Sequence, residues 1–264
     1  MERRVLSKML ARLALAASVA SLAPVQAAAD ELAEPCRGET FDGALYTACA
    51  VDLSDYELAL FWRGEDGRPI AQPQRLRSLL EARGEEMVLA TNGGMYHEDR
   101  RPVGLFISGG VVERPLVRGD GPGNFQLLPN GVFFVASGVA GIAETEAFHR
   151  AGLTPDLATQ SGPLLVSGGA LHPAFRPASD SVTRRSGIGV SQAGDQVWIV
   201  ISETPVNLHS FARFFRDHLG LADALYLDGR VSRLDVPGDQ RREFGPAMGP
   251  ILAVTRKQAA RAGD

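Results

Sequence analysis

The chain reads Leu89-Ala90-Thr91-Asn92-Gly93-Gly94 at the end of one apolar run and Leu157-Ala158-Thr159-Gln160-Ser161-Gly162 at the end of another. Each stretch has the pattern of a strand that ends in an amide side chain close to glycine, and each is followed by a Ser-Gly-Gly turn. A third run, 225–227, ends comparably in Asp228-Gly229. Since glycine lets backbone N–H groups approach a ligand closely, the three ends together predict one shared pocket. Ordinary turn chemistry is the alternative explanation for any one of them.

Further apolar runs around these stretches are rich in β-branched or aromatic residues, which favour strands. Glycine pairs at 109–110 and 168–169 and the dipeptide Asn130-Gly131 are hairpin signals, because tight turns require a positive φ. The predicted strands are Leu58–Trp62, Met87–Thr91, Val103–Ile107, Gly131–Ala136, Leu164–Val166, Gly187–Val190, Val197–Ile201, Ala224–Leu227 and Ile251–Thr255.

Three segments have helical patterns. The first covers about Gln74–Arg83, and a shorter one covers Glu144–Arg150. The third opens at Asn207, a favourable N-cap, and ends at Gly220, with apolar residues at i, i+3, i+4 and i+7. We therefore predict an α+β fold, with one domain over about residues 35–258 that consists of twisted, largely antiparallel or mixed β-sheets and a few packed helices.

The composition is that of a globular protein, with 45% hydrophobic and 22% charged residues. These fractions exclude an intrinsically disordered chain. The formal net charge is −4, and no run of basic residues is present, so we expect no nucleic-acid partner.

Residues 1–27 have the pattern of a secretory signal. Arg3 and Lys8 precede an apolar stretch, and small residues lead up to Ala27. We expect cleavage near Ala27 and a periplasmic or secreted product without an integral membrane segment. An uncleaved anchor is the alternative, but Arg12 interrupts an apolar run that is already shorter than the roughly 20 residues of a spanning helix. The last residues, 259–264, are predicted to be a frayed tail.

The chain has two cysteines, Cys36 and Cys49. In an oxidising compartment a disulfide is the leading interpretation, and two buried thiols are the alternative. Because there is no C-x-x-C motif and no flanking histidine, neither a redox centre nor a zinc site is indicated. We expect no metal and no cofactor.

The sequence contains no G-x-S-x-G, Walker loop, H-E-x-x-H or dinucleotide-binding fingerprint. The remaining candidates are carboxylates and arginines at strand ends. Asp228 directly follows one predicted strand and Glu203 follows another, and paired carboxylates hydrolyse glycosidic bonds. Arg184 and Arg185 precede the strand 187–190, where a guanidinium could bind a phosphate or carboxylate. A surface salt bridge is the alternative for Glu203 and the arginines.

Several stretches occur in the order found in one family. They read Thr91-Asn92-Gly93-Gly94-Met95-Tyr96 with Pro102-Val103-Gly104-Leu105, then Thr159-Gln160-Ser161-Gly162-Pro163-Leu164-Leu165, Arg185-Ser186-Gly187-Ile188-Gly189-Val190, and Leu219-Gly220 through Ala224-Leu225-Tyr226-Leu227-Asp228-Gly229. The chain thereby resembles the phosphodiester glycosidases, a family that includes the animal lysosomal uncovering enzyme, over roughly residues 50–255. Met95–Glu98, Gly121–Phe125 and Pro129–Val132 resemble its bacterial, envelope-directed branch most.

The resemblance implies an α+β fold with the site between sheets, and hydrolysis of a sugar-1-phosphodiester. One departure concerns the stretch Asp228-Gly229-Arg230-Val231-Ser232, where animal-type members have Asp-Gly-Gly-Gly-Ser. Arg230 and Val231 add bulk there, so either the pocket is narrower or Arg230 itself contacts an anionic ligand.

We expect an exported hydrolase that cleaves a glycosyl phosphodiester in an envelope or extracellular glycan, with a carbohydrate or sugar phosphate as its substrate. Asp228 is the predicted catalytic carboxylate, and Glu203 and His97 are candidates for the second acid–base group, since His97 follows the turn at 92–94. Arg185 is expected to hold the phosphate, and Asn92 and Gln160 to position sugar hydroxyls. The full set of predicted substrate contacts is Asn92, Gly93, Gly94, Gln160, Ser161, Gly162, Arg185 and Ser232.

Two alternatives stay open at this point. The first is a non-catalytic envelope protein that binds an anionic polysaccharide, sugar phosphate or phospholipid headgroup in the same cleft. The second is a metal-dependent phosphodiesterase in which Asp228 and Glu203 hold a divalent ion.

Overall fold

The computed structural model describes residues 32–239 and 245–258, which belong to one compact unit. The predicted signal segment 1–27 and the tail 259–264 lie outside the described residues. The described strands form sheets of seven, four and five strands, and their pairings are antiparallel. The predicted α+β class with largely antiparallel sheets is confirmed.

The seven-stranded sheet carries the residues that matter most for the site. Its order is β1 (Cys36–Phe41), β2 (Ala44–Asp52), β13 (Gln196–Ser202), β12 (Ser186–Val190), β14 (Asp223–Asp228), β10 (Leu164–Ser167) and β11 (Ala170–Leu171). Cys36 lies directly opposite Cys49 across the β1–β2 hairpin. The two side chains form the predicted disulfide, which is thereby confirmed.

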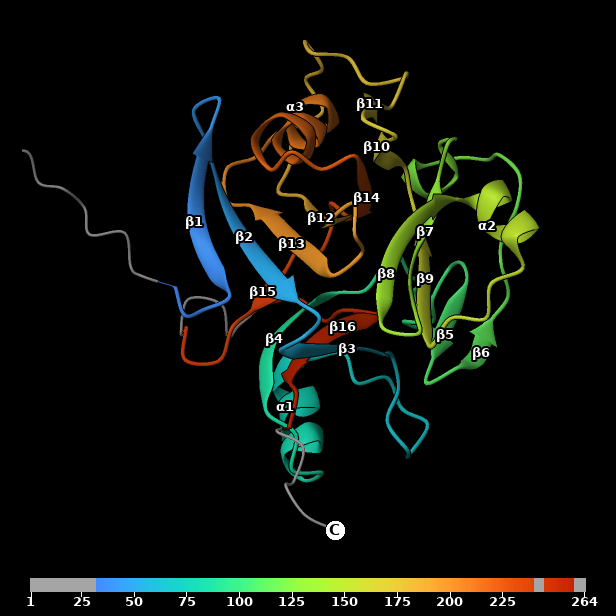
Figure 1. Cartoon of the computed structure of the whole chain (residues 1–264), viewed down its shortest axis with the longest axis vertical. Coiled ribbons are helices and arrows are strands. Elements are labelled where there is room, and N and C mark those ends of the chain that lie inside the picture. The colour runs from blue at the N-terminus through green and yellow to red at the C-terminus, as the bar shows by residue number, and fades with distance from the viewer. Residues whose placement is uncertain (1–31, 240–244, 259–264) are drawn as a thin grey trace, which may run out of the picture. The chain divides into compact units, whose positions relative to one another are not determined.

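The other two sheets complete the fold (Figure 1). The four-stranded sheet has the order β15 (Leu234–Asp235), β4 (Met87–Asn92), β16 (Ile251–Arg256) and β3 (Tyr56–Phe61). The five-stranded sheet has the order β6 (Val111–Arg114), β5 (Phe106–Ser108), β9 (Leu157–Ser161), β7 (Gly131–Ala136) and β8 (Val139–Glu144). One apolar cluster contains side chains from all three sheets, including Val51, Leu89 and Phe133.

Helices pack on these sheets through the apolar faces that the sequence indicated. Helix α1 (Pro73–Glu81) lies against β4 (Figure 1), and α2 (Thr145–Ala151) follows β8, where the Glu144 side chain accepts a hydrogen bond from the N–H of Ala147. Helix α3 (Leu208–Arg213) begins at Asn207, whose side chain accepts from the N–H of Ser210. It continues as the π-helical turn η2 (Phe214–His218), and a short 3-10 helix, η1 (Asn124–Gln126), precedes β7.

The close approach of α3 and η2 to β12 explains two glycines of that strand. A Cβ atom at Gly189 would lie 2.6 Å from the side chain of Leu221 and 2.9 Å from that of Phe215. At Gly187 the same atom would lie 3.0 Å from Phe211. The pattern Gly-Ile-Gly therefore provides a flat surface on which aromatic side chains pack.

Some sequence predictions were wrong in detail. The strand expected over 103–107 begins only at Phe106, as β5, and residues 103–105 belong to the connection that leads into it. Asn130-Gly131 does not form a hairpin turn. Instead, Gly131 begins β7, and the β7–β8 turn lies at Ser137-Gly138, where φ is 50° and 78°. None of the described helices is long and apolar enough to cross a membrane.

Candidate functional site

The register of two neighbouring strands brings Arg185 and Asp228 together. Strands β12 and β14 are antiparallel, and Ser186 at the start of β12 lies opposite Asp228 at the end of β14. Arg185, which precedes β12 by one residue, therefore lies at the same edge of the sheet as Asp228. Both are buried, with 2% and 7% of their surface exposed, and both line one cavity of about 920 Å³.

The walls of this cavity come from elements of different sheets. The segment after β4 contributes residues between 95 and 103, and the loop around η1 contributes residues 122–126. The approach to β12 and the end of β14 supply the rest, between 181 and 185 and between 226 and 231. A cavity of this size, with polar side chains converging in it, is the usual form of a small-molecule site.

Asp228 is the buried carboxylate of the cavity. Its Oδ1 accepts hydrogen bonds from the N–H groups of Gly229 (2.6 Å) and Arg230 (2.8 Å). Burial raises the pKa of Asp228 above its ordinary value, although the backbone N–H groups of residues 229–231 and the charge of Arg230 act in the opposite direction. A carboxylate with a raised pKa is a stronger base, which suits proton transfer near neutral pH.

Arg185 is held by neutral protein acceptors. Its guanidinium donates to the carbonyl of Val206 (2.7 Å, from Nε), the hydroxyl of Tyr226 (2.9 Å, from Nη1) and the carbonyl of Ser181 (2.7 Å, from Nη2). A guanidinium has five N–H donors, so these three bonds leave two. Within the described part of the chain, no carboxylate lies within 4.0 Å of it. A buried cation without a carboxylate partner favours an anionic ligand.

Tyr226 joins Arg185 to the turn that follows Asp228. Burial raises the pKa of Tyr226 to about 12, so its phenol stays neutral at physiological pH. A Cβ atom at Gly229 would lie 1.9 Å from the Tyr226 hydroxyl. Glycine after Asp228 is therefore required by the position of this hydroxyl.

A second arginine–tyrosine pair lines the same cavity. Nη1 of Arg100 donates to the Tyr96 hydroxyl (3.2 Å) and to the Ala247 carbonyl (2.5 Å), and the guanidinium carbon lies 5.2 Å from the centre of the Tyr96 ring. Burial raises the pKa of Tyr96, and the negative charge of Asp228 raises it further, whereas Arg100 and Arg230 lower it. Tyr96 therefore lies within electrostatic reach of Asp228.

The three strand ends that the sequence singled out are joined by hydrogen bonds. The Thr159 hydroxyl at the end of β9 donates to the carbonyl of Gly93 after β4 (2.5 Å). The Ser161 hydroxyl donates to the carbonyl of Leu227 in β14 (3.2 Å). These bonds connect the three sheets.

The two amide side chains at these ends are buried in the protein and do not line the cavity. The oxygen of Gln160 accepts from the N–H groups of Leu105 (3.1 Å) and Val117 (3.0 Å), and its nitrogen donates to the Val117 carbonyl (2.6 Å) and the Thr145 hydroxyl (3.2 Å). Asn92 is fully buried, and among the described residues its Nδ2 has no hydrogen-bond partner. Their predicted contacts with sugar hydroxyls have no support from this geometry.

The other predicted site residues divide into those that line the cavity and those that do not. His97 lines it and is exposed. Glu203 lies outside the lining, where it pairs with Arg184 (2.6 Å) and accepts from the Thr47 hydroxyl (2.8 Å). The Ser232 hydroxyl is 2.8 Å from the main-chain carbonyl of Asp228, so it braces the turn. Four more buried residues lie outside the lining: Gly93, Gly94, Ser161 and Gly162.

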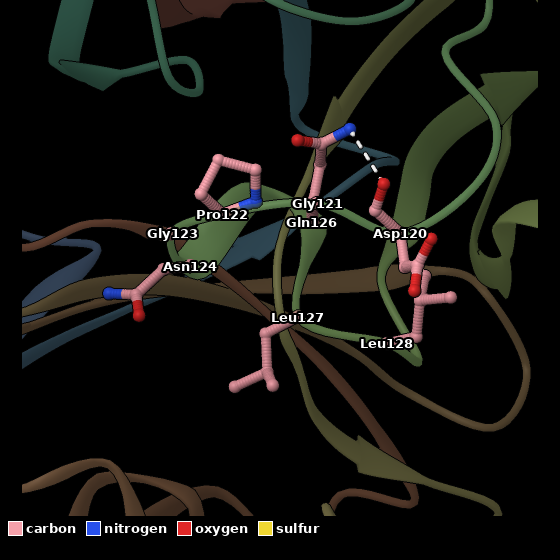
Figure 2. Close-up of a pocket in the computed structure, with 8 residues that line it drawn as sticks. All are labelled: Asp120, Gly121, Pro122, Gly123, Asn124, Gln126, Leu127 and Leu128. Atoms are coloured by element: carbon pink, nitrogen blue, oxygen red, sulfur yellow. Dashed lines mark hydrogen bonds between the residues drawn. The ribbon is translucent and has the colours of Figure 1, made fainter.

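A second hollow, of about 790 Å³, adjoins the first. It is formed by the loop 120–128, and four of its residues line both hollows: Pro122, Gly123, Asn124 and Gln126. Figure 2 shows the Gln126 amide turned back to the carbonyl of Asp120 (3.4 Å), while the Asn124 side chain points away from it. The loop is thus a shared wall between two hollows.

Sequence reasoning did not single out Tyr96, Arg100, Asn124 or Tyr226 as site residues. Tyr96, Asn124 and Tyr226 stand in stretches that carry the family resemblance, so the resemblance could have indicated them as site residues. Arg100 stands two residues before Pro102 and had no such signal. Among residues 32–239 and 245–258, no group of three or more His, Cys, Asp or Glu side chains is arranged to hold a metal ion.

The family model described as phosphodiester glycosidase matches residues 85–236, and the chain belongs to that family. The chain is 31% identical over 191 residues to a protein described as the uncharacterized protein YigE of Escherichia coli (strain K12), which covers 72% of this chain and 74% of that protein.

A solved structure shares the fold. It is the catalytic domain of zebrafish N-acetylglucosamine-1-phosphodiester alpha-N-acetylglucosaminidase, auto-inhibited by its pro-peptide. The TM-score is 0.52 at 15% identity, over 83% of this chain and 81% of that one.

Proposed function

We propose that the protein is an exported phosphodiester glycosidase that hydrolyses a sugar-1-phosphodiester in an envelope or extracellular glycan. The observation that carries this proposal is the juxtaposition of Arg185 and Asp228 at one edge of β12 and β14, both buried and both facing the same cavity. The buried guanidinium, which has two N–H donors left, suits the phosphate. The carboxylate beside it suits proton transfer.

The chemistry of the bond accounts for a site with a single buried carboxylate. Asp228 and the exposed Glu98 are the carboxylates among the described residues that line the cavity. Most glycosidases need a second carboxyl group to protonate a sugar or alcohol as it leaves. A phosphate monoester leaves as a stable anion, so a guanidinium that stabilises its charge can take the place of that acid.

The proposed reaction is a displacement at the anomeric carbon. A water oxygen forms a bond to C1 while the C1–O bond to the phosphate breaks, and the electron pair of that bond leaves with the phosphate monoester. Asp228 accepts the proton of the attacking water and later releases it to solvent. Arg185 binds the phosphoryl oxygens, on which charge increases. His97, at the exposed side of the cavity, is the candidate for a further proton transfer.

Export and the location of the substrate are part of the proposal. The N-terminal pattern of residues 1–27 and the Cys36–Cys49 disulfide support an oxidising compartment outside the cytoplasm. Such a compartment holds the envelope glycans in which sugar-1-phosphodiesters occur. Detection of the disulfide-bonded, shortened protein in a periplasmic or culture fraction tests this part. An intact leader in the cytoplasmic fraction would contradict it.

The activity can be tested with methyl phosphodiesters of N-acetylglucosamine, glucose and mannose, by following the release of free sugar and methyl phosphate. We expect the wild-type protein to cleave at least one of them, and Asp228→Asn to lower kcat by about 10²–10⁴-fold, because general acid–base catalysis typically contributes that much. The matched control is Asp223→Asn at the other end of β14, outside the cavity lining, where the side chain accepts a hydrogen bond from the N–H of Gly168 (3.0 Å). This control should stay within about threefold of the wild type, since an amide oxygen accepts the same bond.

Three results would contradict the proposal. Turnover by Asp228→Asn equal to that of the wild type would remove Asp228 from the reaction. Binding of the diesters without sugar release would favour the non-catalytic alternative. Loss of activity in excess chelator, with recovery on adding a divalent ion, would favour the metal-dependent alternative.

A further inference from the structure

The cavity has two arginine–tyrosine pairs, and they come from different sheets. Arg185 donates to the hydroxyl of Tyr226 (2.9 Å) at the β12–β14 edge, and Arg100 donates to the hydroxyl of Tyr96 (3.2 Å) in the segment after β4. Each guanidinium also lies near the ring of its tyrosine, at 5.5 Å and 5.2 Å from the centre. The proposed reaction uses the first pair and leaves the second without a role.

Asp228 lines the same cavity as both pairs. Its negative charge raises the pKa of Tyr226 on one side and of Tyr96 on the other. The N–H of Arg230 donates to Asp228 Oδ1 (2.8 Å), and the side chain of Arg230 lines the cavity and lowers the pKa of Tyr96. Arg100 and Arg230 are therefore two cations near Tyr96, in addition to Arg185.

The cations near Tyr96 have no carboxylate partners. Across the described ranges, Arg100 donates hydrogen bonds only to a hydroxyl and a carbonyl. Arg230 is exposed at the cavity, and its side chain makes no hydrogen bond or ion pair with the described residues there, although its charge acts on Asp228. By contrast, the neighbouring Arg101 is paired with Asp99 (3.5 Å) outside the cavity. Cations that line a cavity without carboxylate partners favour an anionic group of a ligand.

We infer that the sugar on which the protein acts carries a second negatively charged group, which Arg100 and Arg230 bind while Arg185 binds the scissile phosphodiester. This inference rests on the proposed function and specifies its substrate class. The second group can be a phosphate, as in a polymer of sugar phosphates, or the carboxylate of a uronic acid. Both are anions that accept hydrogen bonds from a guanidinium, and the probes below separate them.

The test uses three sugars that each carry a methyl phosphodiester at C1: glucose, glucose 6-phosphate and glucuronic acid. It compares their rates of cleavage and their equilibrium binding. We expect wild-type kcat/KM to be about 10-fold to 100-fold higher for at least one of the charged sugars than for glucose, as charge-assisted hydrogen bonds contribute that range. The preferred sugar identifies the phosphate or the carboxylate. Arg230→Gln and Arg100→Gln should each lower this preference by about 10-fold, whereas Arg230→Lys should retain most of it.

The controls separate this inference from the proposed function. Arg101→Gln removes a nearby cation outside the cavity and should leave the preference unchanged. Equal cleavage of all three diesters by the wild type, or a preference that Arg230→Gln and Arg100→Gln leave intact, would overturn the inference and leave the proposed function standing. If none of these diesters and none of the N-acetylglucosamine and mannose diesters is cleaved, the proposed function fails, and the ratio of the Kd values for charged and neutral sugars decides the inference alone. A ratio near one would overturn it.

Discussion

The substitution Gly229→Ala tests how the turn after Asp228 organises the site. A Cβ atom at this position would lie 1.9 Å from the Tyr226 hydroxyl, so that oxygen must move by about 1.1 Å before the distance reaches even 3.0 Å. The hydroxyl is also the acceptor of the 2.9 Å bond from Arg185. The displacement therefore passes directly to the guanidinium that is proposed to hold the phosphate.

A misplacement of about 1 Å in an active site can lower the rate by about 10²-fold, and overpacking costs about 1–3 kcal/mol of unfolding free energy. We expect both effects in Gly229→Ala, measured as kcat/KM on the preferred diester and as the free energy of unfolding in denaturant. Tyr226→Phe provides the matched control. Without the hydroxyl, the nearest remaining atoms to a Cβ at this position are 3.2 Å away, in Thr183 and in the Tyr226 ring.

The double variant Gly229→Ala/Tyr226→Phe should therefore recover to within about threefold of Tyr226→Phe alone, so that the two changes are strongly coupled. Independent, additive effects on kcat/KM would refute the steric explanation. Wild-type activity in Gly229→Ala would refute the role of the Arg185–Tyr226 pair as well.

Other expectations follow from the packing and the charges. Gly189→Ala should cost about 1–3 kcal/mol of unfolding free energy, because the added methyl collides with Leu221 and Phe215; an unchanged value would contradict the proposed packing. Gln160→Ala should cost about 3 kcal/mol by denaturant titration, since it leaves buried partners of four hydrogen bonds unsatisfied; an unchanged stability with weaker substrate binding would restore the predicted sugar contact. The raised pKa of Asp228 means that its ionisation destabilises the folded state as the pH rises through that pKa, so the Tm of Asp228→Asn relative to the wild type should increase from pH 4 to pH 8. A constant difference in Tm would show that burial does not oppose the charge.

The fold class followed from local patterns, because strand and helix signals depend on neighbouring residues. The helix from Asn207 is an example, since its cap and its apolar spacing are both local. The hairpin of β1 and β2 was not predicted. Strand β2 is an apolar, largely buried run, but most side chains of its partner β1 are exposed or half-buried, so β1 has no apolar pattern that would indicate a paired strand. The Asp42-Gly43 turn, where φ is positive at both residues, was the signal that could have indicated it.

The site was only partly accessible from sequence, for a physical reason. That Asp228 and Arg185 line one cavity could be predicted because both stand at strand ends, and the pairing of β12 with β14 brings such ends together. The sequence could not predict whether an amide side chain at a strand end faces the cavity or the protein interior, because that depends on the loops that pack over it. For Gln160, the backbone of Leu105 and Val117 takes up the side chain, and no pattern in residues 157–162 encodes that contact.

The most direct test of the central claim is a crystal structure of Asp228→Asn with an uncleaved sugar-1-phosphodiester. We predict phosphoryl oxygens within about 3.2 Å of the Arg185 guanidinium and the side chain at position 228 next to the anomeric carbon, with room for one water between them. A phosphodiester bound in the hollow of loop 120–128, or elsewhere without contact to Arg185, would contradict the account.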